Sequence, residues 1–82
     1  MFDIKFEKKA NKFFNNLDNS SKLEVAKKIE KLKTNPRLGK PLTGNLAGLW
    51  SLRIGKYRAI YKIIQDKLLI LVLDLGHRAN IY

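Results

Sequence analysis

The run of apolar residues at 68–73 constrains the fold of this chain more than any other feature. Its sequence, Leu-Leu-Ile-Leu-Val-Leu, has no polar position at which a strand could face water. A short continuous run of this kind is typical of a β-strand that is buried on both faces. We therefore expect a strand at 68–75 whose two faces are covered by the rest of the chain.

Two segments before this run alternate between apolar and polar residues, as half-buried strands do. They span 49–54 and 57–64, and Gly55-Lys56 between them predicts a two-residue hairpin turn. Residues 65–67, Gln-Asp-Lys, predict a second turn that leads into the strand at 68–75. The three strands are therefore expected to form an antiparallel meander.

The N-terminal part of the chain begins with the same alternation and then changes period. Phe2, Ile4 and Phe6 alternate with polar neighbours, which predicts a short strand at 1–6. From residue 7 onward the apolar positions follow the i, i+3, i+4, i+7 pattern of an amphipathic helix at 7–17. These positions are Ala10, Phe13, Phe14 and Leu17.

A second helix is predicted to open at Ser21, because Glu24 three residues later completes a capping-box pattern. The helix ends at Asn35-Pro36, since a residue before proline resists the α conformation. Residues 36–48 contain two prolines and three glycines and predict a long ordered loop. The buried side of the second helix is expected to consist of Leu23, Ala26, Ile29 and Leu32.

The order of these elements, β-α-α-β-β-β, predicts an α+β fold. We expect a mainly antiparallel four-stranded sheet with the helical hairpin packed on one face and the other face relatively open. At 82 residues the chain has room for one hydrophobic core. We therefore interpret residues 1–82 as a single domain.

The chain is strongly basic, with 17 Lys and Arg against 7 Asp and Glu and a formal net charge of +10. The simplest interpretation of this charge is a solvated surface that keeps a small protein soluble. The alternative, which we favour, is binding to the backbone of a nucleic acid or to an acidic protein.

Composition argues against several classes of site and location. The chain has no Cys and a single His, so disulfides and metal centres are not expected, and we predict no cofactor. No apolar stretch approaches the roughly 20 residues of a membrane-spanning helix. The N-terminus lacks the apolar core of a signal peptide. We therefore expect a cytoplasmic protein without a membrane contact.

Arginines in the second half of the chain are candidates for directed phosphate contacts, because a guanidinium group offers a planar fork of donors. Arg53 and Arg58 lie on adjacent strands across the tight hairpin, where their side chains can share a face, and Arg78 leaves the third strand. Three guanidinium groups that converge on an uncovered sheet face would form a phosphate cradle. The other basic residues expected to contact RNA are Arg37, Lys40, Lys56 and Lys62.

The seven C-terminal residues, Gly-His-Arg-Ala-Asn-Ile-Tyr, place an imidazole, a guanidinium and a phenol directly after the buried strand. His77 adjoins Arg78, and neighbouring side chains of an extended segment point to opposite faces. His77 is therefore either a catalytic proton carrier or a packed, structural residue. Tyr82 could stack on a base or supply a proton.

Two stretches of the chain resemble the RelE/ParE toxin superfamily, with the RelE branch as the closer likeness. One is residues 49–61, LWSLRIGKYRAIY, and the other is residues 76–82, GHRANIY. The specific parts are Leu-Arg-Ile-Gly-x-Tyr-Arg and the terminal Gly-His-Arg-x-x-x-Tyr, in this order and at this spacing. Length, basic charge and the helical hairpin extend the resemblance over essentially the whole chain.

The resemblance implies a toxin of a type II toxin–antitoxin system, a ribosome-dependent endoribonuclease that cuts mRNA in the ribosomal A site. It implies metal-independent attack of the RNA 2′-OH on the scissile phosphate, and neutralisation by an acidic RelB-like antitoxin. Carried over by position, the catalytic residues are Arg53, Arg58, Arg78 and Tyr82. Ser51 stands where members of the family often carry Lys or Arg, so this chain has one positive charge fewer there.

Two other functions stay open at this point. The superfamily fold also serves ParE-like toxins, which bind and poison DNA gyrase without catalysis, and fold alone does not decide function. A catalytically inactive module that binds RNA or protein is the third candidate, consistent with the missing charge at Ser51. The arginines of the second half of the chain favour the nuclease.

Overall fold

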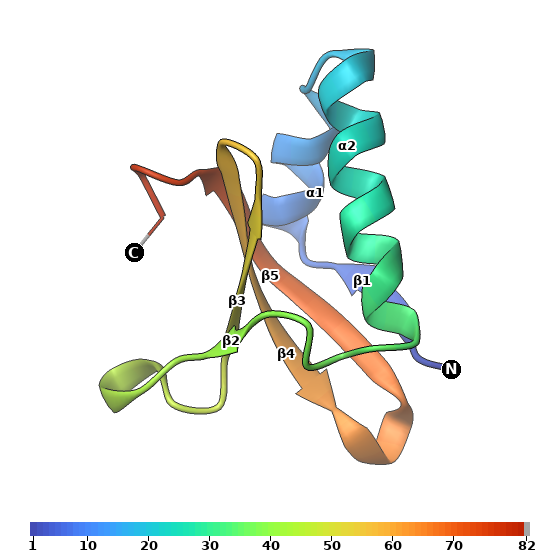
Figure 1. The fold of residues 1–82 in the computed structure, drawn as a ribbon, viewed down its shortest axis with the longest axis vertical. Helices are drawn as coiled ribbons and strands as arrows, with labels where there is room; N and C mark the ends of the chain where they lie inside the picture. The colour runs from blue at the N-terminus through green and yellow to red at the C-terminus, as the bar shows by residue number, and fades with distance from the viewer. Residues whose placement is uncertain (82) are drawn as a thin grey trace.

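The computed structural model describes residues 1–81. Two helices and five strands follow one another along the chain (Figure 1). They are β1 (Asp3–Phe6), α1 (Lys8–Asn15), α2 (Asn19–Glu30), β2 (Lys40–Pro41), β3 (Trp50–Ile54), β4 (Tyr57–Ile64) and β5 (Leu69–His77). Short 3-10 turns occupy Lys31–Lys33, Gly44–Leu46 and Gln65–Lys67.

The five strands form one sheet in the order β1-β5-β4-β3-β2. Strand β1 pairs with β5 in parallel, and the other neighbouring strands pair antiparallel. Both helices pack on one face of the sheet (Figure 1). The predicted α+β fold is confirmed. The structure adds one short strand, β2, inside the segment that the sequence indicated as a loop.

Strand β5 is covered more completely on one face than on the other. Ile70 and Val72 face the helices and are fully buried. Leu69 and Leu71, which alternate with them, are only half-buried. The expectation of a strand buried on both faces is therefore correct for the helix side and wrong for the far side, because the sheet has helices on one face only.

Helix α2 differs from its prediction in its start and in its buried face. It begins at Asn19, and Asp18 takes the N-cap position in an extended conformation, earlier than the predicted cap at Ser21. The side chains that face the sheet are Val25, Ile29 and Leu32. Leu23 and Ala26, which were expected inside, are both exposed, and Leu23 is 58% exposed because it lies on the opposite side of the helix.

The segment before β3 is clamped to the sheet by Tyr61. This side chain is fully buried, its hydroxyl donates to the Pro36 carbonyl (2.7 Å) and it accepts from the Gly39 N–H (3.1 Å). A side chain at position 39 would collide with the Ser51 carbonyl and with the Tyr61 hydroxyl, so the close approach requires glycine. The clamp fixes the path into β2 along the edge of β3.

Among residues 1–81, no helix combines the length and the apolar character needed to cross a membrane.

Candidate nucleic-acid interface

Arg53 and Arg58 lie directly opposite each other on β3 and β4. The hairpin register follows from the two-residue turn at Gly55-Lys56, which also pairs Ile54 with Tyr57. Because Ile54 and Tyr57 point into the core, the two arginines point away from the helices. The prediction that their side chains share a face is confirmed.

Ser51 fixes the direction of the Arg58 side chain. Its Oγ accepts a hydrogen bond of 2.8 Å from Arg58 Nη1. Ser51 is 5% exposed and Arg58 is half-buried, so water competes only partly with this bond. Ser51 therefore helps to hold the guanidinium of Arg58 in place.

A pocket of about 440 Å³ opens beside these side chains. Its walls come from α2, the segment around β2, and strands β3 and β4. Among the lining residues within 1–81, four are cations and none is a carboxylate. The cations are Lys28, Lys40, Arg53 and Arg58. A concave surface with one sign of charge attracts anions, and guanidinium groups suit phosphate oxygens in particular.

Lys28 is the one cation of the pocket that the sequence did not single out. It precedes the buried Ile29 on α2, and it reaches the pocket because α2 runs along β3. Lys40 enters from β2, where it pairs with Ser51 in the sheet register. Only the packing of α2 and the clamp on residues 36–41 bring these two lysines to the arginines.

The remaining basic residues of the prediction do not line this pocket. Arg37 and Lys62 are exposed elsewhere on the surface. Lys56 lies in the hairpin turn, with its Nζ 5.6 Å from the centroid of the Tyr57 ring. Arg78 is half-buried after the end of β5, and its backbone N–H donates to the Lys56 carbonyl (2.9 Å).

His77 packs on the helix side of the sheet. Its ring centroid lies 5.8 Å from that of Phe13 on α1 and 5.3 Å from that of Tyr57. The sheet register places His77 opposite Tyr57 and places Gly76 opposite Arg58. The imidazole is therefore on the face opposite to the cationic pocket, which favours its structural role.

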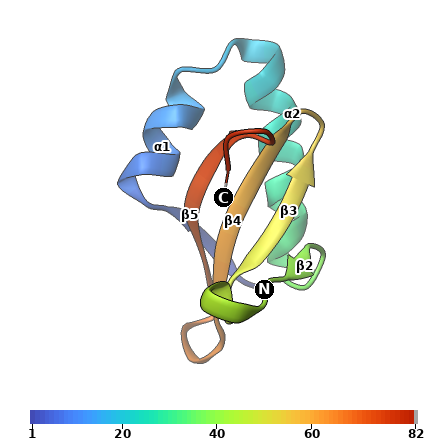
Figure 2. The same ribbon diagram turned by 90° about the vertical axis from the view of Figure 1, so that its left-hand side faces the viewer.

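The C-terminal segment turns back over the sheet face away from the helices (Figures 1 and 2). Ile81 is 9% exposed, and it packs so closely over Gly76 that a Cβ there would lie 2.9 Å from its Cδ1. This face is thus less open than predicted. Tyr82, a predicted catalytic residue, lies outside the described residues.

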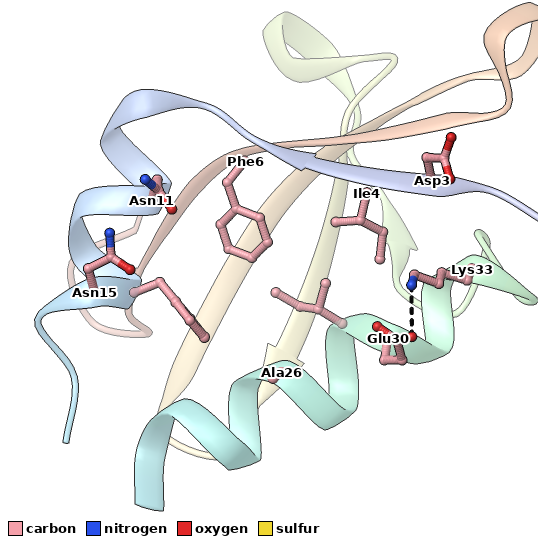
Figure 3. A pocket seen from close by; sticks show the side chains of 10 residues that line it. Asp3, Ile4, Phe6, Asn11, Asn15, Ala26, Glu30 and Lys33 are labelled. Carbon is pink, nitrogen blue, oxygen red and sulfur yellow. Dashed lines mark ion pairs between the residues drawn. The ribbon is translucent and has the colours of Figure 1, made fainter. Parts of the chain in front are cut away.

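A larger hollow of about 520 Å³ lies on the helix side, between β1, α1 and α2. Figure 3 shows its apolar wall, with Ile4 and Phe6 opposite Ala26. Its one cation, Lys33, forms a 2.8 Å ion pair with Glu30. Because two carboxylates, Asp3 and Glu30, outnumber this cation, the hollow has none of the anion-attracting character of the cationic pocket.

Comparison with known proteins identifies the family to which this fold and this basic face belong. The family of ParE toxins of type II toxin–antitoxin systems matches residues 2–82. This chain belongs to the RelE/ParE toxin superfamily. The resemblance inferred from residues 49–61 and 76–82 is thereby confirmed.

Individual relatives place this RelE/ParE toxin near the RelE branch. Toxin RelG of Mycobacterium tuberculosis is 46% identical over 46 residues, which are 56% of this chain and 53% of that protein. The match thus spans about half the length of this curated relative. The toxin–antitoxin complex RelBE of M. tuberculosis matches with a TM-score of 0.84 and 30% identity, covering 94% of this chain and 98% of the matched one.

A third comparison concerns the fold alone. The isolated Escherichia coli RelE toxin superimposes with a TM-score of 0.81 at 20% identity, over 94% of this chain and 84% of the matched one. The arrangement of two helices on a five-stranded, mostly antiparallel sheet is therefore shared with that toxin.

Proposed function

We propose that this toxin is a ribosome-dependent endoribonuclease that cuts mRNA in the ribosomal A site. The observation that carries the proposal is the cationic pocket, in which Arg53 and Arg58 face one space together with Lys28 and Lys40. The similarity to RelG and to the toxin of a RelBE complex supports this activity over others of the superfamily.

In the proposed reaction the substrate carries its own nucleophile, the ribose 2′-OH. A bond forms between this oxygen and the scissile phosphorus, and the bond from phosphorus to the 5′-oxygen breaks. The 2′-OH loses a proton and the leaving 5′-oxygen gains one. Arg58 and Arg53 bind the non-bridging oxygens, where negative charge increases in the transition state.

Ser51 is part of this proposal because it orients Arg58 before substrate arrives. A donor that is already aimed at the developing charge needs no reorganisation during the reaction. Lys40 and Lys28 hold the phosphates that flank the scissile one. Arg78, which does not line the pocket, would contribute a further cation from beyond the end of β5, and Tyr82 would hold or protonate the substrate.

The pocket supplies charge but no conventional proton acceptor. Its lining residues in the described part of the chain include no His, Asp, Glu or Tyr. The contribution of the protein is therefore stabilisation of the phosphorane, and the proton of the 2′-OH passes to water. The in-line alignment of the 2′-OH has to come from elsewhere. We assign this alignment to the ribosome, and we expect the toxin alone to be a poor nuclease on free RNA.

We further propose an acidic RelB-like antitoxin as the partner of this toxin. The M. tuberculosis relative was solved as a toxin–antitoxin complex. A net charge of +10 favours an acidic partner and accelerates their association. Co-expression with the neighbouring small open reading frame should give a stable complex and relieve growth arrest, and the absence of any complex would count against this partner.

Poisoning of DNA gyrase is the second candidate, because the matching family is described by its ParE toxins. Brief induction in cells followed by mapping of mRNA 5′ ends distinguishes the two. The proposal predicts new 5′ ends in phase with codons and intact DNA. Intact mRNA together with double-strand DNA breaks would establish the gyrase activity instead. If neither mRNA cleavage nor DNA breaks occur, the protein is a binding module without catalysis.

A further inference from the structure

The cationic pocket continues along α2 into a second hollow. This hollow has a volume of about 270 Å³ and lies between the C-terminal half of α2 and the edge of β3 beyond its pairing with β2. It shares Lys28 and Arg53 with the cationic pocket, so the two form one continuous surface. The further cations in it are Lys27 on α2 and Lys31 at the C-cap of this helix, one turn later.

The lysines of this surface are not neutralised by the protein. None of Lys27, Lys28 and Lys31 forms an ion pair with a residue in the described range 1–81, and neither does Arg53. Like charges at i and i+4 destabilise a helix. The single carboxylate among the described lining residues, Glu24, lies against Gly55, one helical turn before Lys27 and Lys28. Four cations against this one carboxylate leave positive charge available to a ligand.

Such a surface fits a nucleic-acid backbone better than a protein. Protein interfaces depend on a buried apolar or aromatic core, and here the uncharged lining is limited to Ile54 and Gly55. Binding to phosphates requires only cations in a row. The described residues that line the hollow include no aromatic side chain on which a base could stack, so the contact would not depend on the base sequence.

We propose that the edge between α2 and β3 is a track for the backbone of a single RNA strand, which leaves the cationic pocket at Arg53 and passes Lys27 and Lys31. The choice of RNA as the polyanion rests on the proposed function. The track itself rests on the position and charge of the lysines.

The test compares two lysine pairs with the same spacing. Lys27→Gln/Lys31→Gln removes the track, and Lys8→Gln/Lys12→Gln removes an exposed pair on α1 that lines neither hollow. Both variants lose the same charge, and circular dichroism checks their folding. The probe is a short single-stranded oligoribonucleotide with 2′-O-methyl groups, which can be bound but not cleaved by 2′-OH attack. Its affinity is measured over a range of salt concentrations.

Each phosphate neutralised on a single strand contributes about −0.7 to the slope of log K against log salt concentration. Loss of two contacts should therefore make the slope of the Lys27→Gln/Lys31→Gln variant shallower by about 1.4 and weaken binding. The Lys8→Gln/Lys12→Gln variant should keep the wild-type slope. Equal changes in both variants, or no change in either, would overturn the track.

A poly-glutamate peptide serves as the second probe. The same change of slope with this peptide would identify a surface for an acidic protein and would also overturn the proposal. Cleavage on ribosomes is measured separately with the wild-type toxin. If the salt slope depends on Lys27 and Lys31 but mRNA is not cleaved, the track is supported and the proposed nuclease activity is refuted. If mRNA is cleaved but the slope does not depend on these lysines, the nuclease activity is supported and the track is refuted.

Discussion

Replacement of Ser51 by alanine tests how far the orientation of Arg58 contributes to activity. The substitution removes only the Oγ that accepts the 2.8 Å hydrogen bond from Arg58 Nη1. The charge of the guanidinium, the sheet pairing and the hydrophobic core stay unchanged. Any loss of cleavage is then a loss of positioning.

The expected loss can be worked out from this contact. A hydrogen bond to a charged group contributes about 1.5–3 kcal/mol. The half-buried Arg58 is partly solvated, so the lower end of this range applies. At about 1.4 kcal/mol for each factor of ten, the Ser51→Ala toxin should cut mRNA roughly 10- to 30-fold more slowly. Removal of the whole donor in Arg58→Ala should cost on the order of a hundred- to thousandfold.

The assay is single-turnover cleavage of mRNA on programmed ribosomes, with Ser20→Ala as the control because Ser20 is an exposed serine outside the pocket. A double-mutant cycle then isolates the coupling between the two residues. Ser51→Ala should have no further effect once Arg58 is alanine. If it slows the Arg58→Ala toxin as strongly as it slows the wild type, Ser51 does not act through Arg58 and the reasoning fails.

Three further predictions concern other residues of the chain. Arg58→Ala and Arg78→Ala should abolish growth arrest while circular dichroism and antitoxin binding stay unchanged; full toxicity of a folded Arg78→Ala variant would remove that residue from the site. His77→Ala should lower the melting temperature and leave the cleavage rate nearly unchanged, because the ring packs on Phe13. An unchanged melting temperature with loss of cleavage would instead assign His77 to catalysis. Tyr61→Phe leaves the Pro36 carbonyl and the Gly39 N–H without their partner, which should cost about 2 kcal/mol, or roughly 8–16 °C in melting temperature; an unchanged value would refute the clamp.

The clamp also predicts a pH dependence. Burial raises the pKa of the Tyr61 hydroxyl. The unfolded chain therefore loses this proton at a lower pH than the folded one, and stability falls as pH rises above about 10. Denaturant unfolding between pH 9 and about 11 should show a shallower fall for Tyr61→Phe than for the wild type. Identical slopes would mean that Tyr61 titrates normally.

The strands and the pairing of the arginines follow from local patterns. Alternation defines β3 and β4, and the two-residue turn between them fixes the register, so Arg53 has to meet Arg58. The alternation of side chains along an extended segment likewise predicts that the His77 and Arg78 side chains point to opposite faces. Such features depend on neighbours in sequence, which is why they can be read without a structure.

The rest of the candidate site depends on contacts between distant segments. Two apolar stripes on α2 compete for the core, and only packing against the sheet selects Val25 over Leu23. This rotation decides that Lys28 reaches the cationic pocket. The hydrogen bonds between the Tyr61 hydroxyl and Pro36 and Gly39 join segments more than twenty residues apart. The resulting position of Lys40 can therefore not be predicted from the local sequence pattern.

Cleavage of one mRNA by the purified toxin, with and without programmed ribosomes, tests the central claim most directly. The account predicts cuts at the A-site codon only when the ribosome is present, unchanged by a chelator, with a 5′-hydroxyl on the downstream fragment. The Arg58→Ala toxin should give almost none. An intact A-site codon after incubation with active, folded wild-type toxin, or equal cleavage by the Arg58→Ala variant, would contradict it.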